Sequence, residues 1–276
     1  MKPIVVYTDL DGTLLDSRTY SFDAARPALS LLRRRRIPLV LCSSKTRKEI
    51  LFYRARLHNK DPFVSENGGG VFVPAGYFGE AGREAGFVPR DGGYEALRLG
   101  ANYADLRVVL KRLRDEEGFA TVGFGDMTPE EVAALTGLPL DQATMGLERE
   151  FDEPFVFHGD DVGLGRLREA IERLGYRFTR GTLPHIHGES DKGRAVSVLN
   201  GLYTRKLGLI VTVAIGDSAN DVPMFSAVDI PVLVRRLDGS HDADAQIVRP
   251  RLGDGIGSAG WNRAVLEVLE ELDGAD

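Results

Sequence analysis

Short apolar runs alternate with amphipathic segments over the first and last thirds of the chain. The runs at residues 4–8, 38–42 and 62–65 have the length of buried strands. Apolar residues recur at helical spacing between them, in residues 23–35 and 47–57. The last third repeats this pattern, with predicted helices at 192–207, 219–226 and 261–272 and predicted strands at 209–215, 230–234 and 246–248. Such alternation is typical of a parallel sheet with helices on both faces.

The middle of the chain has a different pattern. Residues 71–78 predict a small hairpin, and the Gly-rich residues 79–93 predict an exposed connection. Beyond them we predict strands at 94–99, 121–124, 154–158 and 176–179, helices at 104–117 and 162–174, and a third helix capped by Thr128. We therefore predict an α/β fold: a doubly wound, Rossmann-like parallel-sheet core (residues 1–81 and 189–276) with an inserted α+β cap (residues 82–188).

Composition narrows the class of protein. The net charge is −6, whereas a nucleic-acid binder usually carries a basic excess, so we expect no nucleic-acid partner. The sequence contains no apolar run long enough to cross a membrane and no pattern of a signal peptide. Cys42 is the single cysteine and cannot form an internal disulfide, which fits a reducing cytoplasm. Arg outnumbers Lys, a weak indication of a thermophile or a GC-rich genome. The oligomeric state is not decided by these features.

The first candidate for chemistry is the pair Asp9 and Asp11, directly after the apolar run 4–8. Catalytic groups of an open α/β sheet collect at the carboxyl ends of its strands. Paired carboxylates suit Mg²⁺, and a carboxylate can also attack phosphorus while a second one serves as general acid and then base. By itself, the pair is also compatible with a solvated turn.

Four further polar clusters occupy predicted strand or helix edges. Residues 43–46 open a helix, where hydroxyl and free N–H groups can cradle phosphate, although helix capping is the better explanation of these residues taken alone. Residues 66–70 form a Gly-rich turn, and Lys192 begins a helix. Residues 217–221 place three polar side chains at one helix start, where they can offer oxygen to a cation.

The order of these clusters resembles the haloacid dehalogenase superfamily of phosphatases, over the whole predicted core. The resemblance implies that Asp9 is the nucleophile and that Asp11 is the general acid/base. It implies that Ser43 and Lys192 hold the transferring phosphoryl group. The implied ligands of a Mg²⁺ cofactor are Asp9, Asp11 (through its backbone carbonyl), Asp217 and Asp221. Dehalogenases of the superfamily lack the second carboxylate, so Asp11 favours phosphoryl transfer.

The cap lies between the Ser43 and Lys192 motifs, which resembles the sugar-phosphatase branch. Residues 43–47, 66–69, 149–154 and 185–188 are similar to the mannosyl-3-phosphoglycerate phosphatases, which make the compatible solute mannosylglycerate. That family usually has Ser where this chain has Asp152. The implied substrate is a small phosphorylated sugar acid.

The residues that we expect to contact this substrate come from both regions: Ser44, Lys45, Glu66, Asn67, Gly68, Gly69, Arg149, His187 and Asn220. The guanidinium of Arg149 matches a carboxylate bidentately, and a surface ion pair with Glu150 or Glu153 is the alternative. His185 and His187 alternate, so we expect them to face opposite sides of an extended segment and at most one to reach the substrate. His187 is preferred, and packing within a strand is the favoured alternative for either.

Other functions remain open on the sequence. One is a different sugar phosphatase, acting on glucosyl-3-phosphoglycerate or sucrose-6-phosphate, and another is a phosphomutase. A phosphoacceptor module of the receiver type is a third, but receivers have about half this length and no inserted cap. The second carboxylate and the cap favour catalysis.

Overall fold

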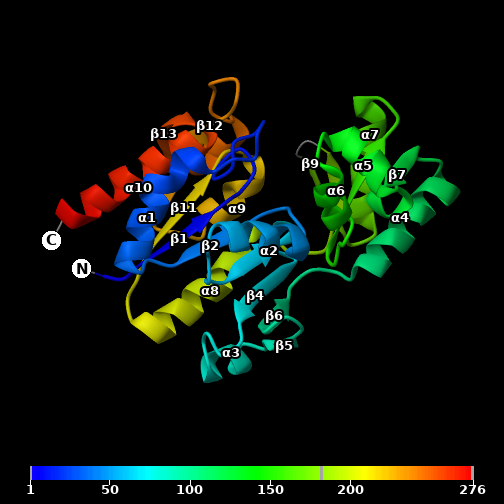
Figure 1. Cartoon of the computed structure of the whole chain (residues 1–276). Helices are drawn as coiled ribbons and strands as arrows, with labels where there is room; N and C mark the ends of the chain where they lie inside the picture. The colour runs from blue at the N-terminus through cyan, green and yellow to red at the C-terminus, as the bar shows by residue number, and fades with distance from the viewer. Residues whose placement is uncertain (1, 181–182, 275–276) are drawn as a thin grey trace.

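The computed structural model describes residues 2–180 and 183–274, so residues 1, 181–182 and 275–276 of the predicted domain ranges lie outside it. The described residues form a nine-stranded sheet and a separate four-stranded sheet, which lie side by side in Figure 1. No described helix is both long enough and apolar enough to cross a membrane.

The large sheet has the strand order β13-β12-β11-β1-β2-β3-β4-β6-β5. Its strands are β1 (Ile4–Thr8), β2 (Leu39–Cys42), β3 (Phe63–Ser65), β4 (Gly70–Pro74), β5 (Val88–Arg90), β6 (Tyr94–Arg98), β11 (Val211–Gly216), β12 (Ile230–Arg235) and β13 (Arg251–Ile256). Strands β13 to β3 are parallel, and β4, β6 and β5 continue the sheet in antiparallel fashion. Thr8 pairs with Leu41 of β2 and Ile215 of β11, so three carboxyl ends meet at one edge.

Helices cover both faces of this sheet. One face carries α1 (Arg26–Arg35), α2 (Arg47–Arg56) and α10 (Gly257–Gly274), and the other carries α3 (Glu80–Glu84), α8 (Lys192–Leu207) and α9 (Val222–Phe225). Side chains of a strand alternate between its faces. In β1, Ile4 and Val6 therefore join the first core cluster, and Val5 and Tyr7 join the second. The doubly wound α/β core is confirmed.

The small sheet is antiparallel, with the order β7-β8-β10-β9. Its strands are β7 (Thr121–Gly123), β8 (Asp152–Phe157), β9 (Arg177–Arg180) and β10 (Pro184–His187). It packs against α4 (Tyr103–Glu117) and α7 (Asp161–Arg173) through Leu106, Phe155, Leu167 and Ile186. The helices α5 (Pro129–Thr136) and α6 (Leu140–Gly146) pack around Val132. Thr128 and Glu131 form the capping box that starts α5, as predicted.

The strand pairing corrects two predictions. Residues 71–78 are not a hairpin, because β4 pairs with β3 on one side and β6 on the other. The predicted cap also begins too early, because residues 88–98 supply β5 and β6 to the large sheet. β4 is buried and would otherwise expose a row of unpaired backbone groups.

Four further elements differ from the prediction. Residues 246–248 lie in the 3₁₀-helix Asp244–Val248, and the edge strand is β13, whose two glycines weaken its strand pattern. Helix α6 and strand β10 were not predicted. Both are short elements of the cap.

Candidate active site

Asp9 follows β1, and its backbone N–H donates to the carbonyl of Ile215 at 2.9 Å. Lys192 is the first residue of α8 and reaches the same point from across the sheet edge. Its Nζ lies 2.7 Å from Asp9 Oδ1 and 2.7 Å from Asp221 Oδ1. The structure therefore brings together the predicted nucleophile, the predicted phosphate-binding lysine and a predicted metal ligand, although they are distant in sequence.

Three carboxylates form one acidic cluster: oxygen atoms of Asp9, Asp217 and Asp221 lie within 4.8 Å of one another. Thr13 Oγ1 donates to Asp217 Oδ1 at 3.1 Å. Burial, reinforced by the charge of Asp221, raises the pKa of Asp217 to about 7. Burial also raises the pKa of Asp9, although Lys192 opposes the shift. One ammonium does not balance three carboxylates, and the all-oxygen donor set fits a hard divalent cation such as Mg²⁺.

Asp11 borders the cavity beside Asp9 and pairs with a different lysine. Its Oδ2 lies 3.0 Å from Lys45 Nζ, which also lies 3.4 Å from Glu49 Oε1. Burial opposes the charge of Lys45, but Asp11 and Glu49 hold its pKa above the ordinary value. Lys45 thus brings a positive charge to the cavity wall, beside the predicted general acid.

The cavity has a volume of about 600 Å³ and lies between the core and the cap. Its core side includes Asp9, Asp11, Ser44, Lys45, Asn67, Asp217 and Asn220, and its cap side includes Phe124, Leu138, Arg149, Leu183 and His185. The acidic cluster therefore faces a chamber whose far wall is built by the cap.

The two serines of the 43–46 cluster have different surroundings. Ser43 is 1% exposed, and its Oγ accepts the N–H of Lys45 at 3.2 Å. Ser44 borders the cavity, and its carbonyl accepts a guanidinium N–H of Arg149 at 2.9 Å. Thr46 and Glu49 form the capping box of α2, so capping explains the end of this cluster.

The structure contradicts the prediction that Glu66 contacts the sugar. Its carboxylate is fully buried and accepts the backbone N–H groups of Glu150, Phe151 and Asp152 at 2.7–3.0 Å. Burial raises its pKa to about 7. Glu66 therefore binds the cap segment to the core, across more than 80 residues of sequence.

Gly68 and Gly69, which were also predicted to contact the substrate, lie against other residues of the protein. A Cβ on Gly68 would lie 2.1 Å from the carbonyl oxygen of Asp191, and one on Gly69 would lie 2.3 Å from Phe151 Cβ. These glycines admit neighbouring protein atoms rather than the predicted ligand.

Arg149 is buried, and among the described residues its ion pairs are not those with Glu150 or Glu153. Its Nε lies 3.6 Å from Glu66 Oε2 and donates to the carbonyl of Asp152 at 2.9 Å. Arg149 borders the cavity and bridges the core and the cap, so its contact with a ligand carboxylate remains a prediction.

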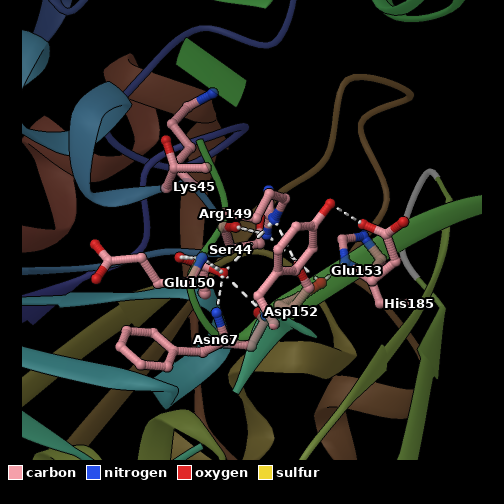
Figure 2. Close-up of polar contacts among 12 residues, drawn as sticks. Ser44, Lys45, Asn67, Arg149, Glu150, Asp152, Glu153 and His185 are labelled. Atoms are coloured by element: carbon pink, nitrogen blue, oxygen red, sulfur yellow. Dashed lines mark hydrogen bonds and ion pairs between the residues drawn. The ribbon is translucent and has the colours of Figure 1, made fainter. Parts of the chain in front are cut away.

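The preference for His187 over His185 is not supported. Residues two apart in a strand share a face. Which of the two histidines reaches the cavity therefore depends on their position along β10, and it is His185 that borders the cavity. Its Nδ1 lies 2.7 Å from Asp152 Oδ1 (Figure 2). His187 is 4% exposed and contacts the carbonyl of Gly188 through Nδ1 at 2.9 Å.

Comparison of the chain with known proteins shows which family it belongs to. The profile of the haloacid dehalogenase-like hydrolases matches residues 6–76 and 166–248. The chain belongs to this family. It is 41% identical over 266 residues, 96% of this chain and 97% of the relative, to the glucosyl-3-phosphoglycerate/mannosyl-3-phosphoglycerate phosphatase of Methanococcoides burtonii. It is 35% identical to the mannosyl-3-phosphoglycerate phosphatase of Pyrococcus horikoshii, covering 84% of this chain and 91% of that protein.

Solved structures agree on the fold. A phosphatase of the superfamily from Bacteroides thetaiotaomicron aligns with a TM-score of 0.66 and 19% identity, over 98% of this chain and 95% of the other. A subclass IIB sugar phosphatase aligns with a TM-score of 0.67 and 14% identity, over 97% and 99%. The family and its relatives confirm the prediction that the chain is a phosphatase.

Proposed function

We propose that the chain hydrolyses the phosphate monoester of mannosyl-3-phosphoglycerate and releases mannosylglycerate. The observation that carries this proposal is the match to the Methanococcoides phosphatase, which extends over 96% of the chain and so includes the cap. The glucosyl analogue is the second candidate, because the name of that relative includes both substrates.

The cavity suits the chemistry of such a substrate. It joins an acidic cluster, which can receive a phosphate with its cation, to a cap wall that carries Arg149 and His185. A sugar acid offers hydroxyl and carboxylate groups to that wall. The product would be a compatible solute, and the buried lone thiol of Cys42 supports a cytoplasmic location.

In the proposed reaction, an Asp9 oxygen attacks phosphorus and forms an aspartyl-phosphate. The bond from phosphorus to the glycerate oxygen breaks, and Asp11 donates its proton to that oxygen. Water then attacks the aspartyl-phosphate, Asp11 takes the proton of the water, and Asp9 is regenerated with release of phosphate.

Charge compensation is the main contribution of the remaining residues. Lys192 lies against Asp9 and stabilises the charge that develops on the phosphoryl oxygens. Asp9, Asp217 and Asp221, with the backbone carbonyl of Asp11, would hold Mg²⁺, which neutralises the phosphate and orients it. Ser43 Oγ accepts the N–H of Lys45, which leaves its hydroxyl proton free to donate to the same phosphoryl group.

Phosphate release from a panel of substrates tests this function. The panel is mannosyl-3-phosphoglycerate, its glucosyl analogue, free 3-phosphoglycerate and sucrose-6-phosphate. We expect the two glycosyl-phosphoglycerates to have the highest kcat/KM, and comparable turnover of sucrose-6-phosphate would refute the narrow specificity. Release of phosphate without a bisphosphate activator would exclude a phosphomutase.

The Asp9→Asn variant tests the nucleophile. The amide cannot form the aspartyl-phosphate, so we expect no turnover while the far-UV circular dichroism and the melting transition remain. Activity retained by this variant would contradict the proposed mechanism.

A further inference from the structure

Asp152 lies at the centre of a buried polar network beside the cavity. It is 0% exposed, at the first position of β8. Its Oδ2 accepts Asn67 Nδ2 at 3.0 Å, and its Oδ1 lies 2.7 Å from His185 Nδ1. Arg149 approaches the same Oδ1 at 3.5 Å (Figure 2). One carboxylate thus contacts three side chains that border the cavity, one from the core and two from the cap.

The carboxylate of Asp152 remains charged. Burial alone would raise its pKa, but His185 and Arg149 hold that pKa below its ordinary value. An ionised carboxylate only accepts hydrogen bonds. Each side chain that contacts Asp152 must therefore present a donor to it.

This requirement fixes the orientation of Asn67. Because Nδ2 donates to Asp152, the other end of the amide, Oδ1, is an acceptor. Oδ1 is buried and has no hydrogen-bond partner among residues 2–180 and 183–274. A buried acceptor without a donor is destabilising, because the hydrogen bond it made to water is not replaced. Asn67 borders the cavity, so a ligand hydroxyl would supply that donor once the atoms that cover Oδ1 move aside.

The same requirement fixes the tautomer of His185. In the neutral ring, the proton must reside on Nδ1, which faces Asp152, so Nε2 carries the lone pair. The His185 side chain is 15% exposed and borders the cavity. Asn67 therefore offers an acceptor, His185 offers one in its neutral form, and the guanidinium of Arg149 offers donors.

We propose that Asp152 is a positioning residue that orients Asn67 and His185 as acceptors for ligand hydroxyl groups and so determines specificity for a polyhydroxylated substrate. This inference rests on the proposed function and adds to it the residue that selects the sugar.

The test compares Asp152→Asn with Glu153→Gln. Asparagine keeps the shape of Asp152 but brings its own N–H donors, so the imposed orientation is lost. Glu153 is an equally buried carboxylate of the same strand, but it binds Tyr103 and Arg107 instead (2.7 Å each). It controls for the cost of replacing a buried carboxylate in β8.

Steady-state kinetics use the substrate that the wild type turns over best and p-nitrophenyl phosphate, which has a phosphate but no hydroxyl group. Two lost hydrogen bonds predict that Asp152→Asn raises KM about 10-fold for the glycosyl substrate. We expect kcat to change less than about 3-fold and p-nitrophenyl phosphate hydrolysis to be unchanged. Glu153→Gln should leave both KM values as in the wild type. An unchanged KM in Asp152→Asn, or an equal rise for both substrates, would overturn the inference.

His185→Asn is the second variant, in case Asp152→Asn does not fold. Its amide can still donate to Asp152, but it removes the Nε2 acceptor from the cavity. We expect the same selective rise in KM, and a KM equal to that of the wild type would count against the proposal.

Nitrogen NMR of the histidine rings gives a readout that does not depend on turnover. In the neutral ring, whose two nitrogen signals differ, His185 should carry its proton on Nδ1, with its signal identified by loss in His185→Asn. The amide introduced by Asp152→Asn can present either its oxygen or its N–H group to the ring, so a population with the proton on Nε2 should appear in that variant, whereas Glu153→Gln should retain the Nδ1 tautomer. A proton on Nε2 in the wild type would overturn the inference. Absence of glycosyl-phosphoglycerate turnover in a wild type with the Nδ1 tautomer would instead overturn the proposed function.

Discussion

Lys192 shows how single residues decide the chemistry of the site. Burial opposes the charge of its ammonium group, but Asp221 and Asp9 hold its pKa above the ordinary value. The lysine therefore remains a cation inside the protein, at hydrogen-bond distance from Asp9. A fixed buried charge needs little reorganisation when a phosphoryl group arrives, which is the condition for electrostatic catalysis.

His187 provides a prediction about pH. Burial lowers its pKa below the ordinary value of 6.5. The unfolded chain therefore binds a proton more readily than the folded one, so stability from this group is present above pH 6.5 and is lost as the pH falls. We expect the free energy of unfolding of the wild type to fall more steeply between pH 7 and pH 5 than that of His187→Asn. Urea unfolding at a series of pH values measures both slopes.

Asparagine is the appropriate replacement because its amide can keep the contact with the Gly188 carbonyl. The variant is expected to be less stable at every pH, since the ring leaves a cavity, so the slope is the diagnostic quantity. Parallel pH profiles for the two proteins would show that His187 titrates normally.

At the scale of elements, the turn at residues 66–70 packs against the start of α8. Gly68 has φ +94° and lies against the backbone of Asp191, the N-cap of the helix that begins with Lys192. Gly68→Ala should reduce the free energy of unfolding by about 3 kcal/mol or more, because both strain and overpacking result. We also expect kcat/KM to fall about 100-fold, since a shift of about 1 Å in Lys192 misplaces the phosphoryl group.

Gly76→Ala is the matched control. Gly76 also has a positive φ (+74°), but a Cβ there meets nothing within 4 Å. It should cost about 1 kcal/mol from backbone strain alone and leave kcat/KM unchanged. Equal stability losses in the two variants would show that the contact with Asp191 is unimportant.

The elements that were predicted correctly and those that were not differ in their sequence signals. β1 and α8 have long apolar runs or clear helical spacing, and their bounds agree with the prediction to within a residue. The assignment of β6 to the large sheet depends instead on pairing with β4, about 20 residues away, and local periodicity contains no pairing information. β13 was missed because Gly253 and Gly255 interrupt its apolar pattern.

At the scale of the whole molecule, the site residues at the ends of regular core elements were predictable, and those whose contacts depend on the cap were not. Asp9, Lys192 and Asp217 stand at ends of regular elements, so strand order alone brings them together. Glu66 was misassigned because its partners are backbone N–H groups of the cap, which no side-chain pattern indicates. Likewise, whether His185 or His187 borders the cavity depends on how the cap docks on the core.

Hydrogen bonds between the core and the cap contribute to this docking. Thr46 Oγ1 donates to the carbonyl of Met145 at 2.9 Å, and Tyr53 OH donates to Gln142 Oε1 at 3.1 Å. Both pairs join α2 of the core to α6 of the cap (Figure 1). Glu66, Asn67 and Ser44 of the core also bind the cap, so opening of the cap to exchange ligands must break this whole set of polar contacts.

The stability of the whole chain should depend on Mg²⁺. A ligand at 100 times its Kd stabilises the folded state by about 2.7 kcal/mol, which corresponds to a rise in Tm of about 5–10 °C at this chain length. We expect that difference between melts of the wild type in Mg²⁺ and in EDTA. Asp217→Asn should abolish the Mg²⁺ shift and should melt higher than the wild type in EDTA, because it removes one of three mutually repelling carboxylates.

The pH dependence of these melts gives a second check with a defined sign. The raised pKa of Asp217, about 7, means that its contribution to the metal-free stability is present at low pH and is lost as the pH rises through 7. In EDTA, the advantage of Asp217→Asn over the wild type should therefore grow between pH 5 and pH 8. Glu49→Gln replaces a buried carboxylate that binds Thr46 instead, so it should keep the Mg²⁺ shift. A shift that persists in Asp217→Asn, or is absent from the wild type, would mean that the acidic cluster is not where the cation binds.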